Sequence, residues 1–191
     1  MNPLDLPSPV TRYRRELWKV LDLDLVQGGD AAEIGVAEGN FSAEILKWPI
    51  RFPIVYMVDR WMHTPSAFGD SANSQVWHDK NLQRAKEQVR GFGDRTVILR
   101  GESIRMADFV PVCSLSLLYI DADHSYDGVM GDLRVWESKV ILGGVVALHD
   151  YENEGYGVKK AVREFCQVRG YQIYLLPEDQ PCDAGAYFFV R

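Results

Sequence analysis

The sequence predicts a single α/β domain: a mostly parallel seven-strand sheet with helices on both faces and a C-terminal antiparallel hairpin. Short apolar runs alternate with segments whose apolar residues recur at helical spacing, which is typical of strands joined by right-handed helical crossovers. The last two apolar runs have only a loop between them, so we expect them to pair antiparallel. The expected strands are 31–36, 54–58, 96–99, 116–120, 145–148, 172–176 and 186–190.

The expected helices precede the first strand and fill the crossovers. Asn40 is expected to cap the helix that runs to Trp48, since asparagine is a favoured N-cap residue. A polar loop is expected over 61–75. The basic runs 12–15 and Lys159-Lys160 are expected to be solvated helix faces, with a short basic patch as the alternative. The apolar residues that define the helices are Tyr13, Leu17 and Val20; Phe41, Ile45 and Trp48; Leu82, Ala85 and Val89; Val129, Leu133, Trp136 and Val140, before a stop at Gly143-Gly144; and Val158, Ala161, Val162 and Phe165.

Length and composition indicate one globular domain over residues 1–191, with 1–30 as an N-terminal helical extension. The chain has 191 residues, of which 47% are hydrophobic and 25% charged, and it shows no repeat or linker. The formal net charge of -6 disfavours nucleic acid as a partner, because an acidic surface repels phosphates.

The expected location is the cytoplasm. Residues 1–7 contain no basic segment followed by an apolar stretch, so no secretory signal is predicted. No apolar run is long enough to span a membrane, so no membrane association is predicted. The three cysteines, Cys113, Cys166 and Cys182, are scattered, which argues against both a disulfide framework and a cysteine zinc site.

Glycine and acidic residues follow successive predicted strands. In an open α/β sheet, ligands bind outside the carboxyl ends of the strands, so these residues are expected to surround one crevice. Any single one could serve a turn, but clustered carboxylates repel each other unless a ligand or cation is present. The strand-end residues are Gly35 to Gly39, Asp59, Gly101 to Ser103, Asp121 to His124 and His149-Asp150.

The first of these loops, taken alone, is best explained as a tight strand-to-helix turn, and it lacks the fingerprint of NAD binding. Glu33-Ile-Gly-Val-Ala-Glu-Gly39 lacks the three-glycine fingerprint that brings a pyrophosphate to a helix N-terminus. Asp59 ends the second strand, where a carboxylate accepts the hydroxyls of a ribose in any adenosine ligand. An NAD(P)-dependent oxidoreductase and a non-catalytic cofactor-binding protein of the same fold are the alternatives.

The strand-end motifs together resemble class I S-adenosylmethionine-dependent methyltransferases, with a Rossmann-like fold. The similarity covers about residues 30–191 and is greatest to small-molecule O-methyltransferases that include macrolide and aminocoumarin sugar enzymes. Ala37 departs from the usual middle glycine. The short N-terminal segment implies that the substrate lid is reduced, is built from 61–75, or comes from a neighbouring subunit, which would make the protein a homo-oligomer. The motifs are Glu33-x-Gly-x-x-x-Gly39, Val58-Asp-Arg-Trp61, Gly101-Glu-Ser103, Tyr119-Ile-Asp-Ala-Asp-His-Ser-Tyr126 and Gly143-Gly-Val-Val-Ala-Leu-His-Asp-Tyr151.

The resemblance implies a role for each strand end in holding S-adenosylmethionine. Glu33, Gly35 and Gly39 would surround its methionine part. Asp59 would hold the ribose, and Glu102-Ser103 would lie near the adenine. Trp61 would cover the adenine or the acceptor; packing of this aromatic residue on the core is an equal alternative.

The chemistry is expected at the fourth and fifth strands. The resemblance favours Asp123 as the general base that takes the acceptor's proton, while His124 is either a second catalytic group or an orienting residue. Asp121 is expected to lie against the cofactor and, with His149 and Asp150, to hold a divalent cation.

Carboxylate oxygens favour magnesium at such a site, and the histidine shifts the preference toward manganese, iron or zinc. The alternative is a metal-free enzyme in which His149 and Asp150 cap the strand end and the following loop. The expected partner is a small-molecule acceptor. A sugar hydroxyl, a phenol and another small alcohol all fit.

Overall fold

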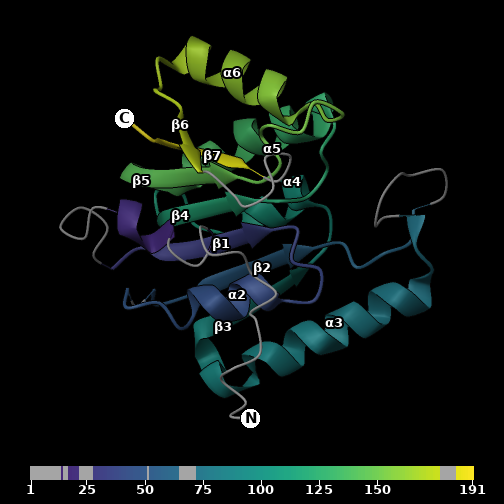
Figure 1. Cartoon of the computed structure of the whole chain (residues 1–191). Coiled ribbons are helices and arrows are strands. Elements are labelled where there is room, and N and C mark those ends of the chain that lie inside the picture. Colours follow the sequence, from purple (N-terminus) through teal and green to yellow (C-terminus); the bar gives the residue numbers. More distant parts are fainter. Residues whose placement is uncertain (1–13, 15–16, 22–27, 51, 65–71, 177–183) are drawn as a thin grey trace, which may run out of the picture.

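The computed structural model describes residues 14, 17–21, 28–50, 52–64, 72–176 and 184–191. They form one seven-stranded sheet of order β3-β2-β1-β4-β5-β7-β6, in which β1 to β5 run parallel and β7 pairs antiparallel with both β5 and β6 (Figure 1). The predicted fold class is therefore confirmed. The strands are β1 Asp30–Ile34, β2 Val55–Asp59, β3 Thr96–Arg100, β4 Leu115–Ile120, β5 Val140–Leu148, β6 Tyr174–Leu176 and β7 Gly185–Phe189.

Helices cover both faces of the sheet and divide the core into two layers. One layer packs α5 and α6 against the sheet, and the other packs α2, α3 and η2 (Figure 1). Strand β4 is buried at all six positions because it is central and covered on both sides. The α-helices are α2 Asn40–Ile45, α3 Gln75–Val89, α4 Ser103–Met106, α5 Tyr126–Trp136 and α6 Val158–Arg169; the 3-10 helices are η2 Leu17–Val20, η4 Arg90–Arg95, η5 Ala107–Phe109 and η6 Glu137–Lys139.

The loops after the parallel strands are joined to one another at the carboxyl edge of the sheet. Gly35 N donates to Val58 O at 2.8 Å, Asp121 N donates to Ile34 O at 2.7 Å, and His149 N donates to Ile120 O at 3.1 Å. Each hydrogen bond continues the ladder by one residue past the strand end. The strand-end residues are thereby fixed side by side along this edge.

Two details of the predicted elements are wrong. Val140 and Gly143-Gly144 do not end a helix, because α5 stops at Trp136 and β5 already begins at Val140. The register of β5 against β4 shifts across this stretch, and Gly143 has a φ of 80°, so the glycines form an irregularity inside the strand.

Asn40 is the first residue of α2 and not its N-cap. The N-cap is Gly39, whose φ of 79° is a left-handed conformation that favours glycine.

Parts of the prediction lie outside the described residues. Of the opening helix, the structure describes Arg14 and the 3-10 turn Leu17–Val20, and of the 61–75 loop it describes 61–64 and 72–75. The connection between β6 and β7 is described only at its last residue, Ala184. Among the described helices, none has the length and apolar character needed to cross a membrane.

Candidate functional site

Neighbouring strands bring two loops of the predicted site together. β4 and β5 pair in parallel with Ile120 opposite Leu148, so the residues that follow them emerge at the same level. Asp121 follows β4, and His149-Asp150 follows β5. Asp150 has a φ of 54°, a strained conformation for a residue with a side chain, and it turns the chain immediately after the strand.

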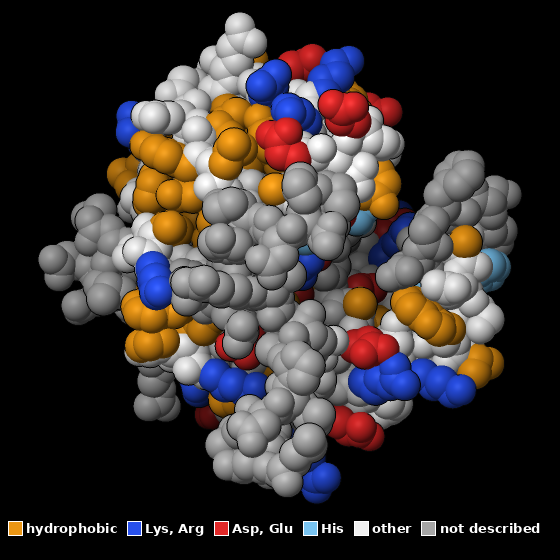
Figure 2. Space-filling view, in the orientation of Figure 1, with side chains coloured by type: hydrophobic (Ala, Val, Ile, Leu, Met, Phe, Trp, Pro, Cys, Tyr) orange, Lys and Arg blue, Asp and Glu red, His pale blue; other side chains and the backbone are white. Residues whose placement is uncertain are grey.

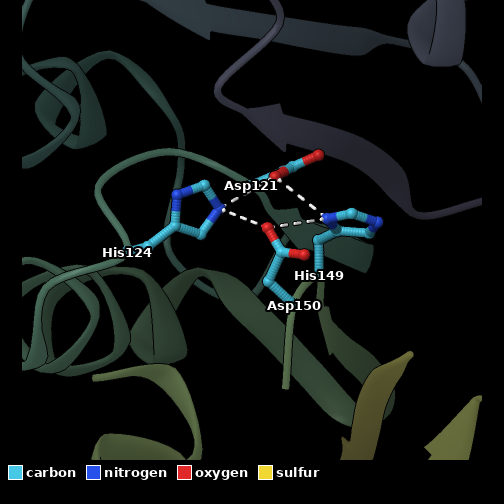
Figure 3. A group of neighbouring side chains, drawn as sticks. All are labelled: Asp121, His124, His149 and Asp150. Atoms are coloured by element: carbon cyan, nitrogen blue, oxygen red, sulfur yellow. Dashed lines mark hydrogen bonds and ion pairs between the residues drawn. The ribbon is translucent and has the colours of Figure 1, made fainter. Parts of the chain in front are cut away.

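The side chains of Asp121, His124, His149 and Asp150 converge at this point and form what we call the Asp–His cluster (Figure 3). His124 Nε2 lies 3.3 Å from Asp121 Oδ1 and 3.0 Å from Asp150 Oδ2. His149 Nδ1 lies 3.5 Å from Asp121 Oδ1 and 3.1 Å from Asp150 Oδ2. Two imidazole nitrogens thus face the same two carboxylates, and one ligand atom from each residue lies within 4.8 Å of the others.

Attraction between the imidazoles and the carboxylates determines which groups of this cluster are protonated. Burial would lower the pKa of His124, but hydrogen bonds with the Asp121 and Asp150 carboxylates outweigh it and raise that pKa to about 9. Burial would likewise raise the pKa of both carboxyls, but His124 and His149 hold the pKa of Asp121 and Asp150 below the usual range. Ionised carboxylates are therefore paired with a protonated His124 when no cation replaces the proton.

The donor set of the Asp–His cluster fits a divalent transition metal. A mixed set of imidazole nitrogens and carboxylate oxygens suits manganese, iron or zinc, whereas magnesium and calcium prefer sites made of oxygen ligands alone. Nε2 of His149 is buried and has no hydrogen-bond partner among the described residues. The structure thus brings together the three predicted metal ligands and adds His124, which we had predicted only as a catalytic or orienting group.

Arg14 is a member of the site that the sequence analysis missed. Its guanidinium lies 3.4 Å from Asp121 Oδ2, and it lies over the rings of Phe41 and Tyr119 at 5.9 and 5.7 Å. The expectation of a solvated basic face is wrong for this residue, because its side chain is 19% exposed. A signal was available, since Arg14 precedes the buried Leu17 and Leu21 by three and seven residues and so shares their helical face.

Glu33 lies buried on β1 at the end of the crevice where the methionine part of the cofactor was expected. It is 3% exposed, and the Ser42 hydroxyl on α2 donates a hydrogen bond to its carboxyl group. Burial raises the pKa of Glu33 to about 8, although the Ser42 hydrogen bond lowers it in part. Glu33 is therefore mostly protonated near neutral pH, and a cationic ligand beside it would restore the charge.

Asp59 ties the end of β2 to the loop after β1. Its Oδ2 accepts the backbone N–H groups of Val36 and Ala37, both at 2.9 Å, and its Oδ1 accepts the N–H of Trp61 at 2.8 Å. A carboxylate has about four lone-pair positions, so one remains for a ribose hydroxyl. The Trp61 indole is 1% exposed and donates from Nε1 to the Ala37 carbonyl at 2.8 Å, so this side chain packs on the loop.

The glycines of the first loop allow close approach of backbone segments. A Cβ on Gly35, whose φ is 90°, would lie 1.9 Å from the carbonyl oxygen of Asp121. A Cβ on Gly39 would lie 2.8 Å from the Cα of Ala85 on α3. The loop between them is therefore held close to both the Asp–His cluster and α3.

The remaining predicted residues lie on either side of these groups. Glu102 is exposed and lies 3.5 Å from Arg105, while the Ser103 hydroxyl donates to the buried Asp132 carboxyl. Asp123 is exposed, and its Oδ1 accepts the Ser125 backbone N–H at 2.8 Å. The structure does not bring Asp123 into the Asp–His cluster. It precedes α5, and its Oδ2 lies next to Gly128 of that helix, where an added Cβ would be 2.7 Å away.

The buried Glu33 predicts an unusual dependence of stability on pH. Because its folded pKa is raised above its usual 4.5, the folded state keeps a proton that the unfolded state loses, and stability falls between about pH 4.5 and 8. Glu33→Gln removes this loss, so the variant should gain stability over the parent by up to a few kcal/mol as the pH rises to 8. Urea unfolding at pH 5, 7 and 9 measures the gain, with the exposed Glu87→Gln as control. A difference that stays constant with pH would contradict the assignment.

A family model described as a methyltransferase domain matches residues 32–151. No curated protein sequence gives a significant match. Among solved structures, the O-methyltransferase NovP is 22% identical with a TM-score of 0.67, over 93% of this chain and 77% of NovP. The calicheamicin methyltransferase CalS11 is 19% identical with a TM-score of 0.62, over 92% of this chain and 80% of CalS11.

The shared fold by itself does not determine the reaction. A precorrin 8W decarboxylase from Methanobacterium thermoautotrophicum is also similar, at 14% identity and a TM-score of 0.63, over 100% of this chain and 96% of that protein. The family match spans β1 to the Asp–His cluster and therefore includes every strand end described above.

Proposed function

Since the chain belongs to the methyltransferase domain family, we propose that it transfers the methyl group of S-adenosylmethionine to a hydroxyl of a small molecule. The Asp–His cluster would hold a divalent cation that assists the reaction. The observation that carries this proposal is the position of that cluster: Gly35, on the loop expected to hold the cofactor, lies against the Asp121 carbonyl. The methyl donor and the methyl acceptor would therefore bind side by side.

The residues of the first two strand ends suit the cofactor. The ammonium group of its methionine part would lie near Glu33 and favour the ionised carboxylate in place of the buried acid. The free lone pair of Asp59 would accept a ribose hydroxyl, and Glu102-Ser103 would border the adenine. NovP and CalS11 are described as methyltransferases, which supports the same choice of cofactor.

The protein's main contribution is alignment, because the sulfonium donor is already activated. The acceptor oxygen attacks the methyl carbon in line with the leaving sulfur, the C–S bond breaks, and S-adenosylhomocysteine is released. Alignment of such reactants supplies at most about 7–11 kcal/mol. When bound, a cation would lower the pKa of the acceptor hydroxyl and fix its position.

Asp123 takes the proton that the acceptor oxygen loses. It lies on the loop after β4 that also carries Asp121 and His124, and only one of its oxygens accepts a described hydrogen bond. His124 cannot serve as easily, because its Nε2 is held between two carboxylates. We therefore assign His124 to the cation and Asp123 to the proton.

The proposal is tested by following a labelled methyl group. The protein is incubated with S-adenosylmethionine labelled on the methyl carbon and with a panel of sugars, phenols and small alcohols. We expect label on an acceptor oxygen and stoichiometric S-adenosylhomocysteine. Label found only on nitrogen or carbon would contradict the choice of a hydroxyl, and S-adenosylmethionine left intact by every acceptor class would count against methyl transfer to such molecules.

A further inference from the structure

A pocket of about 490 Å³ opens between the loop after β5 and the first half of α6. This volume falls within the range of small-molecule sites. All of its lining residues lie between Asn153 and Glu164. Figure 2 shows Lys and Arg side chains among acidic ones on this part of the surface, over α6. The pocket has no part in the roles assigned so far.

The pocket shares a wall with the Asp–His cluster. The ring of Tyr156, which lines the pocket, stacks on the His124 ring with centroids 4.6 Å apart and planes 15° from parallel. Gly157 N donates to the His124 carbonyl at 2.8 Å, and a Cβ on Gly157 would lie 2.1 Å from Tyr126 N. The two loops are therefore fixed together, and an acceptor in the pocket would lie beside the cluster.

Two of the cations in the pocket are not paired with a carboxylate in the part of the chain that the structure describes. Lys159 is paired with Glu152 at 2.5 Å. Lys160 Nζ instead lies 4.8 Å from the centroid of the Tyr126 ring, and Arg163 Nε contacts the Tyr151 hydroxyl at 3.3 Å. Neither Lys160 nor Arg163 forms an ion pair with a carboxylate of the described residues.

The acidic side chains of the pocket leave these two cations available. Glu164, one turn beyond Lys160, accepts a hydrogen bond from the Tyr126 hydroxyl at 2.6 Å in place of pairing with the lysine. Glu154 is exposed on the loop. In a chain with a net charge of -6, two unpaired cations three residues apart on one helix, beside a reaction site, indicate recognition of an anion.

We infer that this pocket binds an oxyanion of the acceptor, so that the substrate is a hydroxylated small molecule that also bears a carboxylate or a phosphate. The inference rests on the proposed function and specifies its substrate class. Lys160 and Arg163 bind the oxyanion, the guanidinium offering the paired donors that suit carboxylate and phosphate. Tyr156 supports the body of the acceptor, whose hydroxyl reaches the Asp–His cluster past His124.

The test compares acceptor-like probes that differ in one anionic group. Calorimetry with the full chain, saturated with S-adenosylhomocysteine and manganese, measures binding of 3,4-dihydroxybenzoate against catechol, and of glucose 6-phosphate against glucose. At least one anionic probe should bind about tenfold or more tightly than its neutral counterpart. The pair of probes that shows the preference identifies the carboxylate or the phosphate as the anion that the pocket binds.

Two double variants complete the test. K160Q/R163Q should abolish the preference and leave binding of S-adenosylhomocysteine unchanged. The matched control K86Q/R90Q, at the end of α3 and the start of η4 on the opposite face of the sheet, should retain it. Equal binding within both pairs, absence of binding by either anionic probe, or a preference that survives K160Q/R163Q overturns the inference while the proposed function stands. Failure of S-adenosylhomocysteine to bind the parent protein overturns both.

Discussion

Removal of divalent cations is expected to lower the rate of methyl transfer by about a thousandfold, and Asp150→Asn is expected to cause a similar loss with cations present. A bound cation is worth several kcal/mol of charge stabilisation, and each 1.36 kcal/mol is a factor of ten. Asp150 Oδ2 lies 3.0 and 3.1 Å from the two imidazole nitrogens, so its charge is central to the Asp–His cluster. Chelation followed by add-back of magnesium, manganese and zinc measures the effect.

The cation that restores most activity should be manganese or zinc, because two of the four ligand atoms are imidazole nitrogens. Asp94→Asn, an exposed carboxylate on η4, serves as the control and should retain full activity. Full activity in the chelated protein, together with an anomalous map that shows no cation between Asp121 and Asp150, would reject the metal.

Asp123→Asn is expected to lower kcat by about 10²–10⁴ while the Kd for S-adenosylhomocysteine stays unchanged. A general base acts on the acceptor's proton, so its loss affects the chemical step and leaves the cofactor's contacts intact. His124→Gln should differ, because His124 contacts the two carboxylates of the cluster: its loss should weaken cation binding and be rescued by excess manganese.

The two variants therefore separate two roles on one loop. If Asp123→Asn transfers the methyl group as fast as the parent does, to an acceptor that the parent methylates, Asp123 has no part in the mechanism. Rescue of Asp123→Asn by manganese, with none for His124→Gln, would reverse the assignment of base and ligand.

The succession of strands and helices along the chain could be predicted from periodicity, because periodicity depends on local sequence, and the residues that follow each strand could be read from the same pattern. The contact between Asp121 and His149-Asp150 follows once β4 and β5 are known to be neighbours. The placement of Asp123 and His124 could not be predicted. Both follow β4, and which side chain turns to the cluster depends on the Ser125 N–H, which donates a hydrogen bond to Asp123, and on the ring of Tyr156 stacked on His124.

The errors in the fold have a similar cause. Gly143-Gly144 after an apolar helical pattern is a reasonable helix stop, but the pairing of Val140 with Leu115 across the sheet outweighs the local signal. Arg14 was missed because its partner, Asp121, lies more than a hundred residues away in the sequence. Long-range contacts of this kind are absent from any local pattern.

The most direct test of the central claim is calorimetric titration of the protein with S-adenosylhomocysteine and, separately, with NAD. The buried Glu33 and the absence of a three-glycine phosphate loop favour the sulfur-containing ligand, whereas the Asp59 carboxylate suits either one. We expect saturable binding of S-adenosylhomocysteine at micromolar protein and none of NAD. Binding of NAD alone would contradict the account and favour an oxidoreductase of the same fold.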